Sequence, residues 1–383
     1  MRSVPSRSIE AETERWPSDL PDGGVRYCAT DETRVLMADG THRAITDIRV
    51  RDEIYGTSRP GWTRQFTRTS VLDRWSVLRP AYRVTLADGT EIVARGDHRF
   101  LTRRGWKHVT GAEQGRDRRP HLTVGGELLG IGRLAEPPQH DADYRAGYLC
   151  GVVRGDGYLA TSAYERRNGR IEILHRFRLA LADPEALLRA RAFLDLMEVP
   201  TRERTFAPAT TNRRAITAIA TNTSGGVERV RRVIRWPPSP PDGWRKGFLA
   251  GIFDAEGSCG ASVLRICNTD PEIIDWTTAC LARFGFNFVI EPPTPNHAAS
   301  YVRVRGGLVE RLRFFHMTGP AITRKQDLSG RAVRTNADLR VVSIEPLGEA
   351  MRMYEVSTGT GDFIVNGVVR QAASAPPVAK TEL

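Results

Sequence analysis

The strongest constraint on the fold of this 383-residue chain is a short motif that occurs twice. An apolar run ends in an acidic residue and a glycine at Leu149–Gly157, and again at Leu249–Gly257. Each copy is predicted to form a short helix with a glycine, Gly151 or Gly251, at its third position. Because glycine has no side chain, it lets two backbones approach closely. The sequence therefore predicts that the two helices pack side by side.

The segments that follow the two motifs also resemble each other. The matching positions are Arg178, Asp183, Pro184 and Glu185 in the first copy and Arg265, Asp270, Pro271 and Glu272 in the second. Each stretch is predicted to be a strand followed by a helix, with the aspartate as N-cap and the proline at the first helical position. A duplication of this length indicates a unit with two-fold pseudosymmetry rather than a solenoid.

Strand-like sequence lies on both sides of this repeat. Tyr82–Leu86 and Glu91–Val93, for example, are separated by a turn that contains Asp88 and Gly89, which is typical of a β-hairpin. The predicted fold class is therefore α/β and β, with a β-rich domain interrupted by an α/β insert. The predicted divisions are a polar tail over 1–27, a β segment over 28–135, the insert over 140–330, a second β segment over 336–371 and a disordered tail over 372–383.

The acids that end the two motifs, Asp156 and Glu256, form the first candidate site. Two helices packed side by side would bring these carboxylates together at their ends. Paired carboxylates can hold Mg²⁺, which activates water and neutralises the charge of a scissile phosphate. For either motif alone, an ordinary turn residue before glycine is the simpler interpretation. The duplication favours the paired site.

The composition limits the partners and the compartment. A formal net charge of +11, carried mostly by arginine, suits a polyanion such as DNA, although a solvated basic surface is the alternative. No apolar run is long enough to cross a membrane, and no secretory signal is recognisable at the start of the sequence. The five cysteines are scattered and odd in number, which predicts a reducing, cytoplasmic environment.

The two acidic motifs resemble the dodecapeptide motifs of LAGLIDADG, or DOD-type, homing endonucleases. This resemblance implies a saddle of two αββαββα-like halves that straddles double-stranded DNA and cuts it at a long specific site with Mg²⁺. It implies Asp156 and Glu256 as catalytic and metal-binding residues, and Lys325 matches the lysine that the family often places late in one half. With both halves in one chain, a monomer is expected. The first motif departs from the family pattern at Arg154 and Gly155.

The flanking segments resemble inteins. The similar blocks are Cys28–Gly40, Gly89–Leu101, Met353–Ser357 and Asp362–Val369. The resemblance implies a β-rich Hint splicing domain interrupted by the nuclease. In this chemistry the Cys28 thiol attacks the carbonyl of Tyr27 and converts a peptide bond into a thioester. His98, with Asp97 beside it, is the candidate that protonates the leaving amine.

The C-terminal splice junction departs from the intein pattern. Members of the family end with His-Asn before a Cys, Ser or Thr, whereas this chain reads Arg370-Gln371-Ala372. Arg95 also stands where the family commonly has a threonine. The sequence therefore predicts a nuclease inside a splicing domain that has lost full splicing, with residual cleavage at Cys28 left open. Two alternatives also remain: a DNA-binding protein that does not cut, and an autoprocessing protein whose nuclease has decayed.

Overall fold

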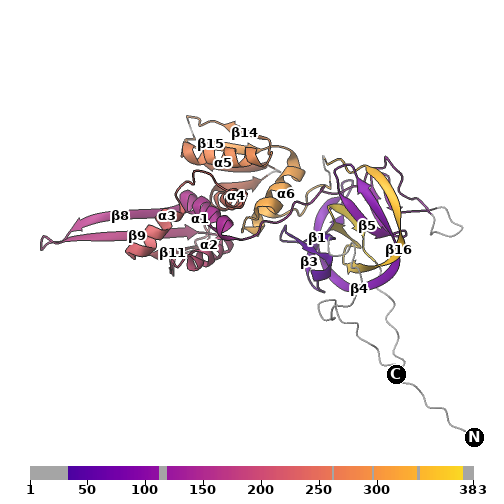
Figure 1. The fold of residues 1–383 in the computed structure, drawn as a ribbon, viewed down its shortest axis with the longest axis horizontal. Coiled ribbons are helices and arrows are strands. Elements are labelled where there is room, and N and C mark those ends of the chain that lie inside the picture. Colours follow the sequence, from indigo (N-terminus) through magenta and orange to yellow (C-terminus); the bar gives the residue numbers. More distant parts are fainter. Residues whose placement is uncertain (1–32, 112–118, 261–262, 296, 334–336, 374–383) are drawn as a thin grey trace, which may run out of the picture.

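The computed structural model describes residues 33–111, 119–260, 263–295, 297–333 and 337–373. Two lobes are visible in Figure 1. One, here named the β unit, contains the first seven strands and the last three. The other, here named the α/β unit, contains the chain between them. The fold is thus mixed α/β and rich in strands, as the sequence predicts.

The β unit is built from two sheets. Its elements are β1 (Arg34–Leu36), β2 (His42–Ala44), η2 (Ile45–Asp47), β3 (Glu53–Ser58), β4 (Gln65–Leu86), β5 (Glu91–Arg95), β6 (Arg99–Thr102), β7 (Gly105–His108), β16 (Val341–Thr358), β17 (Asp362–Val365) and β18 (Val368–Gln371). One sheet has the order β2-β1-β17-β18-β6-β7, and the other has the order β16-β4-β3, with β5 also paired to β4. The predicted hairpin at Asp88 and Gly89 is confirmed as the β4–β5 turn.

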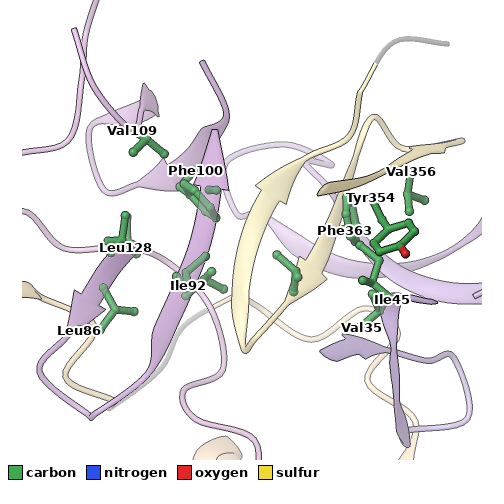
Figure 2. Packing of buried hydrophobic residues seen from close by; sticks show 14 of the residues in the cluster. Val35, Ile45, Leu86, Ile92, Phe100, Val109, Leu128, Tyr354, Val356 and Phe363 are labelled. Carbon is green, nitrogen blue, oxygen red and sulfur yellow. The ribbon is translucent and has the colours of Figure 1, made fainter. Parts of the chain in front are cut away.

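Strands from the two ends of the described chain are interleaved in these sheets. Val35 of β1 pairs with Val365 of β17, and the long strands β4 and β16 pair along most of their length. Buried side chains from both segments, such as Phe100 and Phe363, share one core, as Figure 2 shows. The β unit is therefore a single packed body although its two segments are far apart in the sequence.

The α/β unit consists of two similar halves. The first half contains α1 (Ala142–Asp156), β8 (Gly157–Glu165), β9 (Ile171–Leu181), α2 (Pro184–Leu196), β10 (Arg202–Ala207), β11 (Ile216–Thr221) and α3 (Ser224–Val233). The second contains α4 (Asp242–Glu256), β12 (Gly257–Gly260), β13 (Val263–Asn268), α5 (Pro271–Arg283), β14 (Phe288–Glu291), β15 (Ser300–Val304) and α6 (Gly307–Thr318), followed by η3 (Thr323–Gln326). Each half therefore runs αββαββα, with the strand orders β10-β11-β9-β8 and β14-β15-β13-β12.

Both predicted N-cap positions are confirmed, but only one of the two aspartates makes a capping hydrogen bond. Asp270 accepts a hydrogen bond from the backbone N–H of Glu272 at 2.9 Å and caps α5 as expected. Asp183 makes no such bond to α2. Its carboxylate instead receives two hydrogen bonds of 2.6 Å from the guanidinium of Arg324. A bidentate pair with a charged donor is stronger than a bond to a single backbone N–H, so the tertiary partner displaces the cap.

The two units pack together through α6. Leu308 and Leu312 pack with β-unit side chains such as Tyr55, and the Nε2 of His316 lies 3.0 Å from the carbonyl oxygen of Gly40. None of the helices in the described residues has both the length and the apolar character needed to cross a membrane. The four cysteines in the described ranges are free thiols.

Candidate active site and nucleic-acid interface

The centre of the α/β unit is the contact between α1 and α4, which depends on four glycines. A Cβ placed on Gly151 would lie 2.5 Å from the carbonyl oxygen of Phe248, and one on Gly251 would lie 2.1 Å from that of Tyr148. One turn earlier, Gly147 and Gly247 are equally close to the facing backbone, with Cβ positions 2.0 and 2.1 Å from carbonyl oxygens. The predicted close approach of the two motifs is confirmed, and it extends over two helical turns.

This contact gives a direct test of the packing. Gly251→Ala is expected to destabilise the protein by about 1–3 kcal/mol, because even a methyl group must push two backbones apart. Helix propensity alone predicts the opposite sign, since alanine is favoured over glycine by up to about 1 kcal/mol. Gly225 of α3 is the matched control, because nothing lies within 4 Å of its Cβ position. Equal melting temperatures for Gly251→Ala and Gly225→Ala would contradict the close contact between α1 and α4.

The acidic residues of the motifs lie at the ends of these paired helices. Asp156 is the last residue of α1 and Glu256 the last of α4, and a Cβ on Gly155 would lie 3.2 Å from the Cγ of Glu256. Burial raises the pKa of Glu256, and the negative charge of Asp156 raises it further. Burial also raises the pKa of Asp156. The structure thus brings the two predicted carboxylates within electrostatic reach of each other.

Lys325 lies beside the two acids. It is part of η3, and its Nζ donates to the carbonyl oxygens of Phe253 and Asp254 at 3.0 and 2.8 Å. A cation at this place complements the partial negative charge at the C-terminus of α4. Its charge also counteracts the upward pKa shifts of Asp156 and Glu256. The three residues predicted for the nuclease therefore lie at one end of the helix pair.

Two further polar residues of the site were not recognised in the sequence. Asn268, at the end of β13, donates from its Nδ2 to Oε1 of Glu256 at 3.2 Å and so orients that carboxylate. Asp254 is buried, and its carboxylate accepts hydrogen bonds from the Tyr148 hydroxyl and from the backbone N–H groups of Ala321 and Ile322. Asp254 therefore fixes the segment before η3. The only available signal for Asn268 was its place at the end of the repeated strand.

The departure at Arg154 has a local explanation. Arg154 occupies in α1 the position of Asp254 in α4. Its Nε donates to the carbonyl oxygen of Ile234 at 2.8 Å, and its guanidinium lies 3.8 Å from the ring centroid of Trp236. Both side chains thus bind the segment that follows the last helix of their own half. Asp254 does so by accepting hydrogen bonds from backbone N–H groups, and Arg154 by donating to a backbone carbonyl.

An open cleft of about 620 Å³ is lined by Asp156 and by the two chain neighbours of Glu256, Ala255 and Gly257. Residues of both halves line it, including Asp156, Asp183, Ser258, Arg324 and Lys325. Since β8 begins directly after Asp156 and β12 directly after Glu256, each acid stands where the first strand of its own sheet starts.

The first sheet presents a basic face away from the helices. Phe177 and Leu179 of β9 are buried against the helices, so the alternate residues Arg176 and Arg178 lie on the opposite face. Through Ala220 and Ala218, the register places Arg202 and Arg204 of β10 on that same face. Three of these four arginines are exposed, and Arg178 is half-buried. An open sheet face with this charge is suited to phosphate groups.

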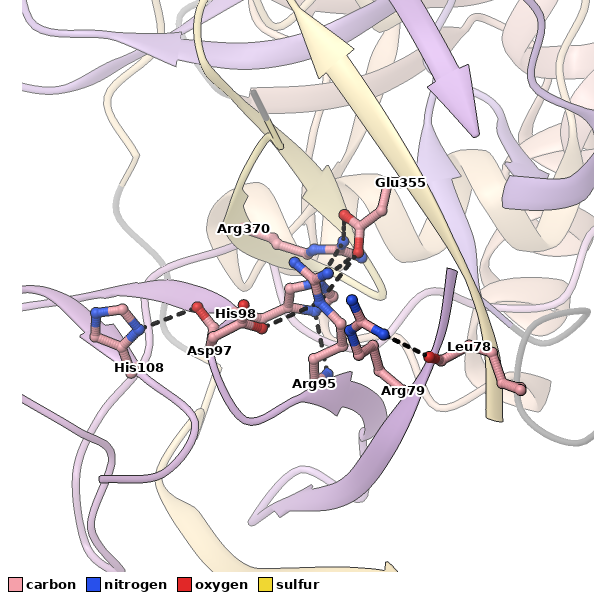
Figure 3. Close-up of polar contacts among 8 residues, drawn as sticks. All are labelled: Leu78, Arg79, Arg95, Asp97, His98, His108, Glu355 and Arg370. Carbon is pink, nitrogen blue, oxygen red and sulfur yellow. Dashed lines mark hydrogen bonds and ion pairs between the residues drawn. The ribbon is translucent and has the colours of Figure 1, made fainter. Parts of the chain in front are cut away.

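The residues predicted for splicing lie in the β unit, except that Cys28 is outside the described residues. His98 is buried between β5 and β6, and its Nε2 lies 2.7 Å from Oε1 of Glu355 (Figure 3). The Arg95 backbone N–H lies 3.3 Å from Nδ1 of the same ring. The same Nε2 also lies 3.0 Å from the guanidinium Nε of Arg95, so it faces a carboxylate and a cation at once. Asp97 is joined to the cluster through Arg95 Nε at 3.0 Å.

Arg370 completes this cluster from β18. It is buried, and its Nη2 lies 2.8 Å from Oε2 of Glu355 and 3.1 Å from Nε2 of His98. Burial and the positive charge of Arg370 lower the pKa of His98 to about 4, so the ring is neutral near pH 7. Burial opposes ionisation of Glu355, but Arg370 and His98 outweigh it, and the pKa of Glu355 falls below its usual value. Both ring nitrogens of His98 are thus engaged inside the cluster.

The cluster is expected to contribute to stability. Glu355→Ala leaves the buried Arg370 without its carboxylate, and breaking a buried pair in this way costs about 3–5 kcal/mol. Asp338→Ala is the matched control, because the pair of Asp338 with Arg340 is exposed to solvent and is expected to contribute little to stability. The measurement is the free energy of unfolding in urea. Equal losses in the two variants would show that Arg370 finds another partner.

Comparison with known proteins gives limited matches. No protein-family model matches the chain. Among curated proteins, the replicative DNA helicase DnaB of Rhodothermus marinus is 30% identical over 99 residues. That match covers 26% of this chain but only 10% of the length of the helicase.

Solved structures that resemble about half of the chain include LAGLIDADG proteins. A complex of I-DmoI with DNA and Mn has a TM-score of 0.38 at 16% identity, over 48% of this chain and 98% of the other. A complex of I-DmoI with DNA and Ca has a TM-score of 0.37 at 16% identity, over 45% and 88%. The N-terminal LAGLIDADG domain of DUF199/WhiA has a TM-score of 0.35 at 16% identity, over 48% and 84%. With identities and scores this low, the function of this chain has to be inferred from its own residues.

Proposed function

We propose that the α/β unit, over residues 140–330, is a homing-type endonuclease that makes a double-strand break at a long specific DNA site. Asp156 and Glu256 are its catalytic and metal-binding residues, and Lys325 is the third catalytic residue. One observation carries the proposal. The glycine contact of α1 and α4 brings two carboxylates and a lysine to one point, where the two sheets begin.

The residues at this point fit Mg²⁺. Among the described residues, no group of three or more His, Cys, Asp or Glu side chains could hold a metal ion without other ligands. Mg²⁺, however, is commonly bound by one or two carboxylates together with water and substrate phosphates. Burial and then the charge of Asp156 raise the pKa of Glu256, and a cation between the two carboxylates would offset both effects. Bound there, Mg²⁺ would neutralise a scissile phosphate and supply an activated water.

The basic sheet face supports double-stranded DNA as the partner. Arginines on a strand can contact phosphates and read guanines in the major groove, which is wide enough for a two-stranded ribbon. Because both carboxylates come from one chain, a monomer is sufficient for the site. We place this activity in the cytoplasm, because the free thiols of the described cysteines are consistent with a reducing environment.

The proposal is tested with a randomised library of DNA duplexes and the purified full-length protein. With Mg²⁺, sequencing of the newly formed ends is expected to show one enriched site cut on both strands, and a chelator is expected to abolish cutting. Enrichment of bound duplexes without new ends would instead support the non-cutting DNA-binding protein. A library that is neither bound nor cut would support a decayed nuclease.

We further infer that the β unit is a Hint-type splicing domain, formed by 28–135 and 336–371 and flanked by tails at 1–27 and 372–383. The interleaved pairing of its two segments is consistent with one domain interrupted by an insert. His98 lies in one intein-like block and Arg370 directly follows another, and the two residues meet in the cluster around Glu355. In this position Arg370 contacts His98 and Glu355 and does not assist a reaction at the C-terminal junction.

Full splicing is therefore predicted not to occur. Release requires an asparagine before a nucleophilic residue, and Gln371 and Ala372 provide neither. At most, the chain is cut slowly between Tyr27 and Cys28, and faster with added thiol, because a thiol intercepts a thioester. Intact-mass measurement after several hours with dithiothreitol distinguishes the outcomes.

The controls for this measurement are simple. Loss of residues 1–27 that depends on thiol and disappears in Cys28→Ala would show that the first step survives. An unchanged mass would show that the β unit is only a scaffold. A ligated product lacking residues 28–371 would contradict the inactive C-terminal junction.

A further inference from the structure

The two halves of the α/β unit differ most in their first hairpins. β8 and β9 pair over nine positions, from Gly157 to Glu165, whereas β12 and β13 pair over only four. The third strand of the first sheet, β11, pairs with β9 only across Phe177–Leu181. The outer part of β8–β9 is therefore a two-stranded ribbon with no further neighbour in its sheet. Figure 1 shows it as an arm that extends away from the rest of the molecule.

The second half has no comparable arm. β15 pairs with β13 from Leu264 to Asn268, so only Val263 lies beyond the third strand. In the first half the corresponding stretch of β9 is Ile171–Arg176. At about 3.4 Å per residue, the first ribbon projects about 20 Å beyond its sheet and the second about 3 Å. With about 3.4 Å per base pair along a DNA strand, the difference is about five base pairs.

The arm also carries the charge and the exposed surface expected of a DNA contact. The segment Gly157–Leu181 contains five arginines and two glutamates, whereas Gly257–Asn268 contains one arginine. The only ion pair of the arm among the described residues joins Arg166 to Glu172 at its exposed tip, where such a pair is worth little. Tyr164 and Ile171 at the tip are 60% and 68% exposed. A free two-stranded ribbon is marginally stable in water, so a partner along its length would order it.

We propose that the DNA site is read unequally on the two sides of the helix pair, with the side that faces β8–β9 longer by about five base pairs. This inference rests on the proposed nuclease function and adds the shape of its substrate. A ribbon of this length fits the major groove, in which side chains reach base edges. The short β12–β13 hairpin ends close to the cutting point, so its half of the site is read by the body of the sheet.

The test is a footprint on the duplex selected from the randomised library. The full-length Asp156→Asn/Glu256→Gln variant is bound to that duplex, and the protected base pairs are mapped by hydroxyl radicals. The position cut by the unmodified protein with Mg²⁺ marks the centre. Protection is expected to extend about five base pairs further on one side. Protected DNA segments of equal length on the two sides would overturn the asymmetry alone. Failure to enrich any duplex would overturn the DNA-binding proposal itself.

A variant with a shortened β8–β9 arm tests whether this arm is responsible for the longer side of the footprint. Residues 163–173 are replaced by Asn-Gly, which forms a tight two-residue turn between the paired residues Ser162 and Leu174. Three paired positions are lost, so the long side is expected to shrink by about three base pairs while the other side is unchanged. Arg265→Ala in the short hairpin is the matched control and is expected to leave the long side intact. A shortened arm with an unchanged footprint would overturn the assignment even if the footprint is asymmetric.

Discussion

Exchange of Asp156 for asparagine or of Glu256 for glutamine is expected to slow DNA cleavage by at least about 10²-fold. An amide keeps the size of the carboxylate but loses the charge that holds a cation and stabilises the developing charge on the phosphate. Binding is expected to remain largely intact, because the arginines of the sheet face are untouched. Single-turnover rates with Mg²⁺, measured beside the affinity for the same duplex, separate the two effects.

Asp270→Asn is the matched control for this exchange. Asp270 has the same chemistry but caps α5, and asparagine is an equally good N-cap. Cleavage by this variant is expected to be unchanged. Undiminished cutting by the Asp156→Asn/Glu256→Gln double variant would disprove the assignment of both acids.

Raising the salt concentration from 50 to 200 mM is expected to weaken DNA binding by about 10³-fold or more. Each phosphate neutralised by an arginine releases a condensed counterion, and six or more such contacts produce a fall of this size. The measurement is a series of binding isotherms at increasing salt, plotted as log affinity against log salt. A flat line over this range would rule out the basic sheet face as a DNA interface.

The slope of that plot identifies the residues involved. Arg202→Ala/Arg204→Ala removes two charges from the face of β10 and is expected to lower the slope by about two. Arg283→Ala is the control, because Arg283 lies at the end of α5 and is bound to Asp242 at 2.9 Å. An equal change of slope in both variants would indicate that charge in general, rather than this face, governs binding.

The repeated motif made the centre of the α/β unit predictable. Glycine at the third position of both copies leaves close helix packing as the simplest use, and Gly151 and Gly251 do pack in this way. The extent of the contact was not predictable. Gly147 and Gly247 lie before the apolar runs, and α1 begins well upstream of its run because Asp141 caps it by accepting the Tyr144 N–H. The predicted helices were therefore too short.

Features that depend on pairing between distant side chains could not be derived from local pattern. Asp183 reads as an N-cap in the sequence, and only the fold brings Arg324 to its carboxylate. Arg370 stands where the intein pattern has a histidine. Nothing nearby in the sequence indicates that it pairs with Glu355 in a buried cluster with His98. In each case a tertiary ion pair replaces the role that local chemistry suggests.

The interleaving of the β unit has a consequence for how the chain folds. The Arg34 backbone N–H donates to the side-chain oxygen of Asn366, which is 332 residues away. Closing a disordered loop of that size is slow and carries an entropic cost. Gly132 and Ala337, near the two ends of the insert, lie so close that a Cβ on Gly132 would be 2.8 Å from the Cβ of Ala337. Once the α/β unit has folded, its two ends emerge at one place, and the loop that remains to be closed is reduced to residues of the β unit. During synthesis β1–β7 leave the ribosome long before β16–β18, and we expect folding of the α/β unit to bring these later strands to them.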